Sequence, residues 1–316
     1  MTEHDPTSAR SETVADLLSW GEHALAAAGV VCAQGTANYR DEAAAIIYHV
    51  LRLEHADPTA YARLVPAADR GRCEALFRQR IGHRMPAAYL LSEAWFAGLP
   101  FHVDSRVLIP RSPFAELIAA RFEPWLAPFE APRILEIGTG SGCMAVACAL
   151  AFPGSAVLAT DVSAAALAVA RLNVKRHCVE EQVTLLAANL FSGIEGRFHL
   201  IVSNPPYVPD ADLANLPPEF TREPRAALAG GPDGLDLVRR IVTGARRHLE
   251  PGGLLAIEVG AGMRALESAF PRVPFTWPAF ENDGDGIAVV AAGDLPRENA
   301  GSGREPRGNL RQEHDR

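Results

Sequence analysis

The stretch at residues 133–152, RILEIGTGSGCMAVACALAF, decides the fold. It opens with the mostly apolar run RILEIG, which is typical of a buried strand. A glycine-rich turn follows, and the apolar run CMAVACALAF after it is typical of a buried helix. A strand that passes through glycines into a helix indicates one unit of an α/β fold with a parallel sheet.

The same alternation continues along the C-terminal part of the chain. Further strands are predicted at 156–161, 182–188, 198–204, 252–260 and 286–293, with a weaker candidate at 272–278. Helices are predicted between them at 142–152, 163–177 and 234–250. Because the strands lack polar alternation, we expect a mainly parallel sheet that helices cover on both faces, with an antiparallel last strand.

The residues before this region show helical periodicity. Apolar positions recur at helical spacing over 11–29, and the patterns at 40–54 and 68–84 repeat it. We expect the first helix to begin near Ser11, with Glu12 and Asp16 in its first turns, and to end at Gly29. These patterns predict a small helical domain over residues 1–92.

A different pattern begins at residue 93. Two short aromatic and β-branched runs flank Gly98-Leu99-Pro100 and predict a hairpin, so 93–112 forms a linker between two domains. Pro113 suits the first turn of a helix and begins the larger domain, predicted over 113–293. The last residues, 294–316, lack apolar content and are predicted to form a disordered tail.

The composition argues against several classes of protein. A net charge of −8 and a pI near 5.7 disfavour a protein whose main task is to bind naked nucleic acid, because phosphate contacts need a basic surface. The longest apolar run, at 143–152, is far shorter than the roughly 20 residues of a membrane span. The five cysteines form no Cys-x-x-Cys pair and no metal-ligand cluster, and the N-terminus has no secretory signal. We therefore expect a cytoplasmic protein without a metal centre.

Glycines and an acidic residue gather at the predicted end of the first strand of the sheet. They are Glu136, Gly138, Gly140 and Gly142. Glycines let a ligand approach the backbone, and the N-terminus of the following helix attracts negative charge. The spacing is G-x-G-x-G, which differs from the dinucleotide pattern G-x-G-x-x-G because Cys143 stands where the last glycine would be.

The next two strands also end in polar residues. Asp161 ends the second strand, where a carboxylate can accept hydrogen bonds from both hydroxyls of a ribose. Asn189 follows the third strand and can meet the edge or the exocyclic amine of a base. A ligand with a ribose, a base and a small group over the glycines fits S-adenosylmethionine. NAD is the weaker alternative.

The motif Asn204-Pro205-Pro206-Tyr207 follows the fourth strand, beside the point where α/β sheets bind ligands. Pro206 forces Pro205 into an extended conformation and fixes the direction of its carbonyl. The Asn204 side-chain oxygen and this carbonyl can then accept both hydrogens of a planar NH₂ group and aim its nitrogen at a methyl donor. Tyr207 can stack on the flat acceptor, and its ring face favours the cationic donor.

This motif predicts the atom that is methylated and leaves the substrate open. DNA adenine and cytosine, RNA guanine and protein glutamine all carry an NH₂ group on a conjugated carbon. The predicted catalytic residues are Asn204, Pro205 and Tyr207, and Asn204 also borders the predicted cofactor site. An inactive cofactor-binding assembly factor is the alternative from another class, although neither motif is eroded.

Five other charged residues are weaker candidates. Arg111 precedes a helix near the hairpin and can line the substrate mouth. Glu219, Arg222 and Glu223 lie in the proline-rich segment after the motif, which is a candidate lid. Glu258 ends the fifth strand and is interpreted as a core carboxylate with a local partner.

Five stretches together resemble the HemK/Prm family of protein glutamine N(5)-methyltransferases. They are VLIPRSPFAELI at 107–118, LEIGTGSGCMAVA at 135–147, SNPPYV at 203–208, EPRAALAGGPDGLDLVRRI at 223–241 and FENDGDGIAVV at 280–290. The resemblance implies a Rossmann-like fold of seven strands that uses S-adenosylmethionine, and a helical N-terminal domain that recognises the substrate.

The resemblance also assigns roles to residues. It implies that Gly138, Thr139, Gly140, Gly142 and Asp161 bind the cofactor, and that Asn204, Pro205, Pro206 and Tyr207 bind the glutamine amide. The family usually has Asp where this chain has Asn189. The asparagine keeps an acceptor for the adenine amine and loses a charge, so weaker cofactor binding is expected.

One stretch distinguishes between branches of the family. Residues 88–113, AYLLSEAWFAGLPFHVDSRVLIPRSP, resemble the PrmB branch, which modifies a large-subunit ribosomal protein. The branch that acts on release factors typically reads Pro-Arg-Pro-Asp/Glu-Thr-Glu where this chain has PRSPFA at 110–115. The implied partner is a ribosomal protein of the large subunit, with no membrane and no free nucleic acid. The alternatives are a release-factor glutamine methyltransferase and an amino-methyltransferase of ribosomal RNA or DNA.

Overall fold

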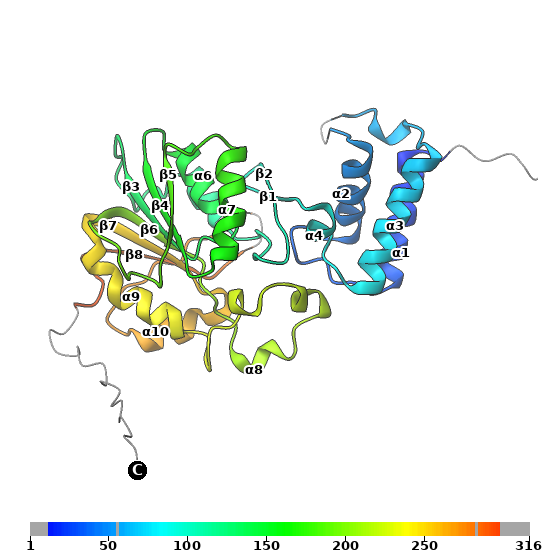
Figure 1. The fold of residues 1–316 in the computed structure, drawn as a ribbon. Helices are drawn as coiled ribbons and strands as arrows, with labels where there is room; N and C mark the ends of the chain where they lie inside the picture. Colours follow the sequence, from blue (N-terminus) through cyan, green and yellow to red (C-terminus); the bar gives the residue numbers. More distant parts are fainter. Residues whose placement is uncertain (1–11, 55–56, 282–283, 298–316) are drawn as a thin grey trace, which may run out of the picture.

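The computed structural model describes residues 12–54, 57–281 and 284–297. It has a helical part formed by the N-terminal residues and a larger α/β part, which lie side by side with a hairpin between them (Figure 1). No helix in these ranges combines the length and apolar content needed to cross a membrane.

The helical part contains four α-helices among the described residues. They are α1 (Val14–Ala27), α2 (Tyr39–Leu51), α3 (Ala67–His83) and the short α4 (Ala87–Leu91), with a 3-10 turn, η1 (Ala60–Ala62), between α2 and α3. Their apolar faces form one buried cluster. Gly21 allows α1 to approach α3, since a Cβ atom at this position would lie 2.5 Å from Cζ of Phe77.

The first helix, α1, begins at Val14 with Thr13 as its N-cap, and Ser11 lies outside the described residues. The Thr13 side chain accepts a hydrogen bond from the Asp16 N–H, and the Asp16 carboxylate accepts one from the Thr13 N–H at 2.9 Å. This reciprocal capping box satisfies two N–H groups that a helix otherwise leaves free. The end of the helix was predicted correctly, because Gly29 follows it in the left-handed region with φ of 56°.

The hairpin is confirmed. Strands β1 (Ala94–Phe96) and β2 (Leu99–Phe101) pair antiparallel, with Ala94 opposite Phe101. Pro113 then forms the N-cap of α5 (Phe114–Ala119).

The α/β part is built on a sheet of six strands in the order β5-β4-β3-β6-β7-β8. The strands are β3 (Arg133–Ile137), β4 (Ala156–Asp161), β5 (Val183–Ala187), β6 (Phe198–Ser203), β7 (Leu249–Glu258) and β8 (Ile287–Ala291). All neighbouring pairs are parallel except β7 and β8, as the sequence predicts.

The prediction of a seventh strand was wrong, because the sheet has six strands within the part of the chain that the structure describes. The weak candidate at 272–278 contributes a single bridge, in which Thr276 pairs with Val289 of β8. Pro274 and Pro278 flank this bridge and lack the N–H groups that would extend a ladder.

Helices cover both faces of the sheet (Figure 1). The core on one face includes residues of α5, α6 (Cys143–Ala151) and α7 (Ala164–Arg176), and the core on the other includes residues of α9 (Asp236–His248) and α10 (Met263–Ala269). Successive residues of β3 alternate between them, since Ile134 belongs to the first core and Leu135 to the second. The predicted tail at 294–316 falls mostly outside the described residues, and Leu295 is buried in the second core.

Asn173 connects three segments of the α/β part. This fully buried residue of α7 accepts a hydrogen bond from the His102 N–H at 2.7 Å. Its amide group donates to the carbonyl oxygens of His102 at 2.9 Å and Ser141 at 2.8 Å. The side chain therefore holds the exit of the hairpin and the glycine loop against one helix.

We expect Asn173→Ala to destabilise the protein strongly, because it leaves one N–H and two carbonyl groups without a partner, at about 1–3 kcal/mol for each group that stays dry. Urea denaturation followed by circular dichroism measures the free energy of unfolding. Lys175→Ala, at an exposed position of the same helix, is the matched control and should stay close to wild type. Equal stability of the two variants would contradict the role of Asn173.

Candidate functional site

A cavity of about 260 Å³ opens at the carboxyl ends of the central strands. The predicted site residues that line it are Arg111, Glu136, Gly138, Thr139, Gly140, Asp161, Asn189, Asn204, Pro205 and Pro206. Gly142 and Tyr207 do not line it. The strand order explains this convergence, because β3, β4 and β6 are neighbours and their ends meet at one edge of the sheet.

The glycines of the loop after β3 have two different functions. Gly138 and Gly140 have φ of 78° and 55°, and a Cβ atom at either position would meet no atom within 4 Å. The backbone at these two glycines is therefore accessible to a ligand in the cavity. Gly142 also has a positive φ, of 80°, but a Cβ atom there would lie 3.1 Å from Cβ of Ala170 in α7. Gly142 thus serves the packing of two helices.

Asp161 organises this loop from the end of β4. One of its carboxylate oxygens accepts a hydrogen bond from the Gly140 N–H at 2.9 Å, and the other accepts one from the Ser163 N–H at 2.8 Å. A carboxylate offers about four acceptor sites, so both oxygens can still accept further bonds from a ligand. Asn189 lies exposed at the rim, directly after β5.

Glu136 lines the cavity with a buried carboxyl group, and one of its two oxygens has no hydrogen-bond partner. One oxygen accepts a hydrogen bond from the Thr139 hydroxyl at 2.6 Å, and the other, Oε1, is buried without a partner. Burial raises the pKa of Glu136 to about 8, and the neighbouring Asp161 adds to the rise. A ligand that brings a donor or a positive charge would satisfy the free oxygen.

The motif at 204–207 rests on a second buried carboxylate. The Tyr207 hydroxyl donates a hydrogen bond to Oε1 of Glu258 at 2.8 Å, and the Ser112 hydroxyl donates to Oε2. The Asn204 side chain also hydrogen-bonds to Glu258. Burial raises the pKa of Glu258, and the hydrogen bonds from Ser112, Tyr207 and Asn204 oppose that rise.

Tyr207 is therefore held by its hydroxyl as well as by its ring. A Cβ atom at Gly260 would lie 2.8 Å from Cε2 of this ring, so only glycine fits there. The interpretation of Glu258 as a core carboxylate with a local partner was wrong in one respect. Its partners come from the segment before α5 and from the motif, both far away in the sequence.

Arg111 lines the cavity, but its charge is already paired. It binds both carboxylate oxygens of Glu223, at 2.7 and 2.9 Å, and lies 5.2 Å from the ring centroid of Phe220. Glu223 is buried and also accepts a hydrogen bond from the Ile109 N–H at 3.0 Å. Among the candidate lid residues, Glu219 is buried as well and faces the helical part.

Sequence reasoning missed the support that lies behind the motif. Ser112 was noted only as a difference between branches of the family, and its contact with Glu258 had no local signal because 146 residues separate the two. Arg80 and Asn173 were not considered. Their fully buried polar side chains inside helical patterns are visible only in the structure.

Comparisons with known proteins agree with this geometry. The family model of the methyltransferase small domain matches residues 117–232. The ribosomal protein uL3 glutamine methyltransferase of Xanthomonas campestris is 44% identical over 90% of this chain and 92% of its own. The proteins of the same name from Bordetella pertussis and Francisella tularensis are 41% and 37% identical, each over 90% of this chain and over 96% and 91% of their own.

These matches cover the helical part, the hairpin and the α/β part together, well above the identity at which family membership is secure. An alignment over 286 of the 316 residues includes the glycine loop and the 204–207 motif. The chain therefore belongs to the family of ribosomal protein uL3 glutamine methyltransferases.

Proposed function

We propose that this protein transfers a methyl group from S-adenosylmethionine to the side-chain amide nitrogen of a glutamine in uL3, a protein of the large ribosomal subunit. The observation that carries the proposal is the Asn204 side chain, bonded to buried Glu258 and next to the rigid Pro205 carbonyl. The names of relatives up to 44% identical support the choice of substrate.

The cavity suits S-adenosylmethionine, which supplies an electrophilic methyl group on a sulfonium when bound. The unpaired oxygen of Glu136 can accept a hydrogen bond from its ammonium group. Open backbone at Gly138 and Gly140 leaves room for its methionine part, and Asp161 can accept from its ribose. Asn189 is assigned to the adenine. NAD suits the site less well, because the glycine loop has the spacing G-x-G-x-G and Cys143 stands where the dinucleotide pattern has its last glycine.

The reaction needs a better nucleophile than a free amide offers, because the nitrogen lone pair is delocalised into the carbonyl. Glu258 can accept a hydrogen bond from the NH₂ group of Asn204, and this contact would turn the Asn204 oxygen toward the substrate. This oxygen and the Pro205 carbonyl then accept the two N–H groups of the glutamine amide. As charge develops on the nitrogen, both contacts strengthen, and the excess proton leaves afterwards.

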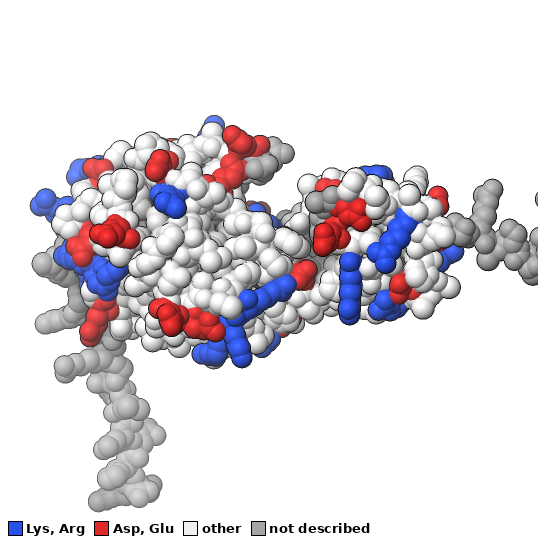
Figure 2. Space-filling view, turned by 90° about the horizontal axis from the view of Figure 1, so that it is seen from above, with Lys and Arg blue, Asp and Glu red and all other residues white. Residues whose placement is uncertain are grey.

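The alternatives receive less support. A release-factor substrate conflicts with the PRSPFA segment, whose Ser112 binds Glu258. Ribosomal RNA or DNA would need an extended basic surface, whereas acidic and basic side chains are interspersed on the face drawn in Figure 2. We propose a cytoplasmic reaction on a protein substrate, and Arg111 shapes its entrance through Glu223 without offering a free charge.

The first prediction concerns the cofactor. Its affinity should rise from about pH 6 to about pH 8, because Glu136 is protonated in the free protein below its pKa of about 8 and must ionise to face an ammonium group. Calorimetric titration in two buffers of different ionisation enthalpy should detect a released proton below pH 8. Glu136→Gln should bind more weakly and release none. Wild-type binding without proton release would contradict the assignment.

The second prediction separates chemistry from binding. Asn204→Ala should lower the single-turnover rate by about 10²–10³, the scale of one donor or acceptor group in a transition-state site, and should lower the cofactor affinity far less. Glu258→Gln should lower the rate about tenfold or more, because the Asn204 amide loses its fixed orientation. Glu195→Gln, at an exposed position, is the charge-matched control. A wild-type rate in Asn204→Ala would refute the proposed role of the motif.

The third prediction concerns the substrate. With labelled cofactor, the protein should methylate purified uL3 on a glutamine, and the label should persist after ribonuclease treatment. Peptide mass spectrometry identifies the residue. A release factor labelled in preference to uL3, or label that ribonuclease removes, would favour one of the two alternatives.

A further inference from the structure

The segment between the motif and α9 forms a loop with a closed neck. We call residues 209–229 the motif loop; it contains α8 (Asp210–Leu213), η2 (Pro218–Arg222) and η3 (Arg225–Ala227). At the neck, the Val208 N–H donates to the Leu228 carbonyl at 2.9 Å, and the Gly230 N–H donates to the Val208 carbonyl at 2.8 Å. A Cβ atom at Gly230 would lie 2.8 Å from Cα of Tyr207, so the neck lies directly against the motif.

The returning half of the motif loop forms a wall of the cavity. Pro224, Ala226 and Ala227 line it together with Asn204 and Pro205. Glu223 fixes this wall to the linker through Arg111 and the Ile109 N–H. The position of the motif loop therefore sets the shape of the space beside the motif.

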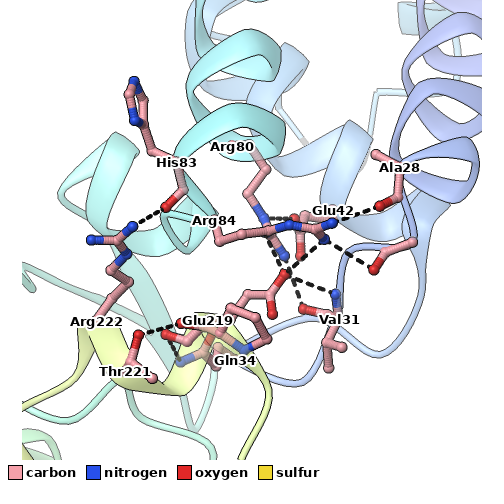
Figure 3. Close-up of polar contacts among 12 residues, drawn as sticks. Ala28, Val31, Gln34, Glu42, Arg80, His83, Arg84, Glu219, Thr221 and Arg222 are labelled. Carbon is pink, nitrogen blue, oxygen red and sulfur yellow. Dashed lines mark hydrogen bonds and ion pairs between the residues drawn. The ribbon is translucent and has the colours of Figure 1, made fainter.

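The tip of the motif loop is inserted into the helical part (Figure 3). One oxygen of Glu219 accepts hydrogen bonds from the Val31 N–H and from Arg80 Nη1, each at 3.1 Å, and from Arg84 Nη1 at 3.4 Å. The Glu219 carbonyl also accepts one from Gln34 at 3.4 Å. Glu219 is fully buried and does not line the cavity.

The helical part holds this acceptor site in place with its own contacts. Arg80, 1% exposed, also donates to Glu42 of α2 and to the Val31 carbonyl at 2.9 Å. Arg84 donates to the carbonyl oxygens of Ala28 at 2.7 Å and Gly29 at 2.9 Å. Their own contacts fix the two arginines in positions from which both can bind the Glu219 carboxylate of the motif loop.

The energetics make this contact sensitive to the position of the helical part. A carboxylate at a loop tip is stable in water, and burial becomes favourable only where charged donors compensate for its lost hydration. The pKa of Glu219 is lowered, since the Val31 N–H and Arg80 outweigh the opposing effect of burial. A displacement of α3 would take Arg80 and Arg84 away and leave the buried carboxylate with only the uncharged Val31 N–H, so the tip would be less stable in its buried position.

We propose that Glu219 is a positioning residue that couples the helical part to the wall of the substrate site. The wall is fully formed only while the helical part holds the tip of the motif loop, so a protein that binds the helical part also acts on the space beside Asn204. This inference rests on the proposed function for its substrate, and on the contacts of Glu219 for the coupling itself.

The test compares Glu219→Gln with Glu42→Gln. Both remove a buried carboxylate that faces Arg80, but only Glu219 belongs to the motif loop. Trypsin can cut this loop after Arg222 and Arg225. In Glu219→Gln these cuts should be about tenfold faster or more than in wild type, whereas Glu42→Gln should be cut there at close to the wild-type rate.

Kinetics then test the consequence for the site. Glu219→Gln should lower kcat/KM for uL3 about tenfold and lower the cofactor affinity much less, because the wall that moves lies beside Asn204 and the tip does not touch the glycine loop. If Glu219→Gln does not fold, Arg84→Gln, at a partly exposed position, weakens the same contact and should show the same pattern to a smaller extent.

Each outcome decides one question. Equal cutting of Glu219→Gln and Glu42→Gln, or fast cutting that only follows a lower thermal stability, would overturn the coupling. So would an unchanged kcat/KM in a variant whose loop is cut quickly. Failure of the wild-type protein to methylate uL3 would refute the proposed substrate and leave the cutting result valid by itself.

Discussion

The architecture depends on the requirement that a buried carboxylate must find donors. Glu136, Glu219, Glu223 and Glu258 are each buried, and the last three bind residues that lie far away in the sequence. Glu258 joins the segment before α5 to the motif, Glu223 joins the linker to the motif loop, and Glu219 joins the motif loop to the helical part. Glu136 differs because it lines the cavity, where its unpartnered oxygen can meet a ligand, whereas the unpartnered oxygen of Glu219 lies away from it.

In this arrangement, the buried carboxylates that fix the geometry are different groups from those proposed to contact the substrate. In the proposed mechanism the groups that would face the amide, the Asn204 oxygen and the Pro205 carbonyl, carry no charge, and buried Glu258 lies behind them. A neutral acceptor pair suits a substrate that starts neutral and becomes cationic, since a charged acceptor would bind strongly before the reaction as well as during it. The buried glutamates can therefore fix the geometry without competing for the substrate.

The sequence predicts most of the fold and most of the residues that line the cavity, because both leave local patterns. The strands at 133–137, 156–161 and 198–203 follow from apolar runs, and the glycine loop and the 204–207 motif are contiguous. The prediction of a seventh strand failed because Pro274 and Pro278 lack the N–H groups needed for further hydrogen bonds to β8, although the aromatic residues beside them suggest a strand. The contacts of Glu219 and Glu258 could not be predicted, because their partners lie 139 and 146 residues away and no periodicity links them.

The closed neck of the motif loop affects how related enzymes could change the set of proteins that they methylate. Because Val208, Leu228 and Gly230 bond to one another, the chain can lengthen or change between them at an entropic cost that grows slowly with length, while the reacting residues stay in place. The tip is not equally free, since its carboxylate matches two arginines in a different part of the protein. A motif loop transplanted from a relative would need matching residues at positions 80 and 84, so the loop would have to be exchanged together with the end of the third helix.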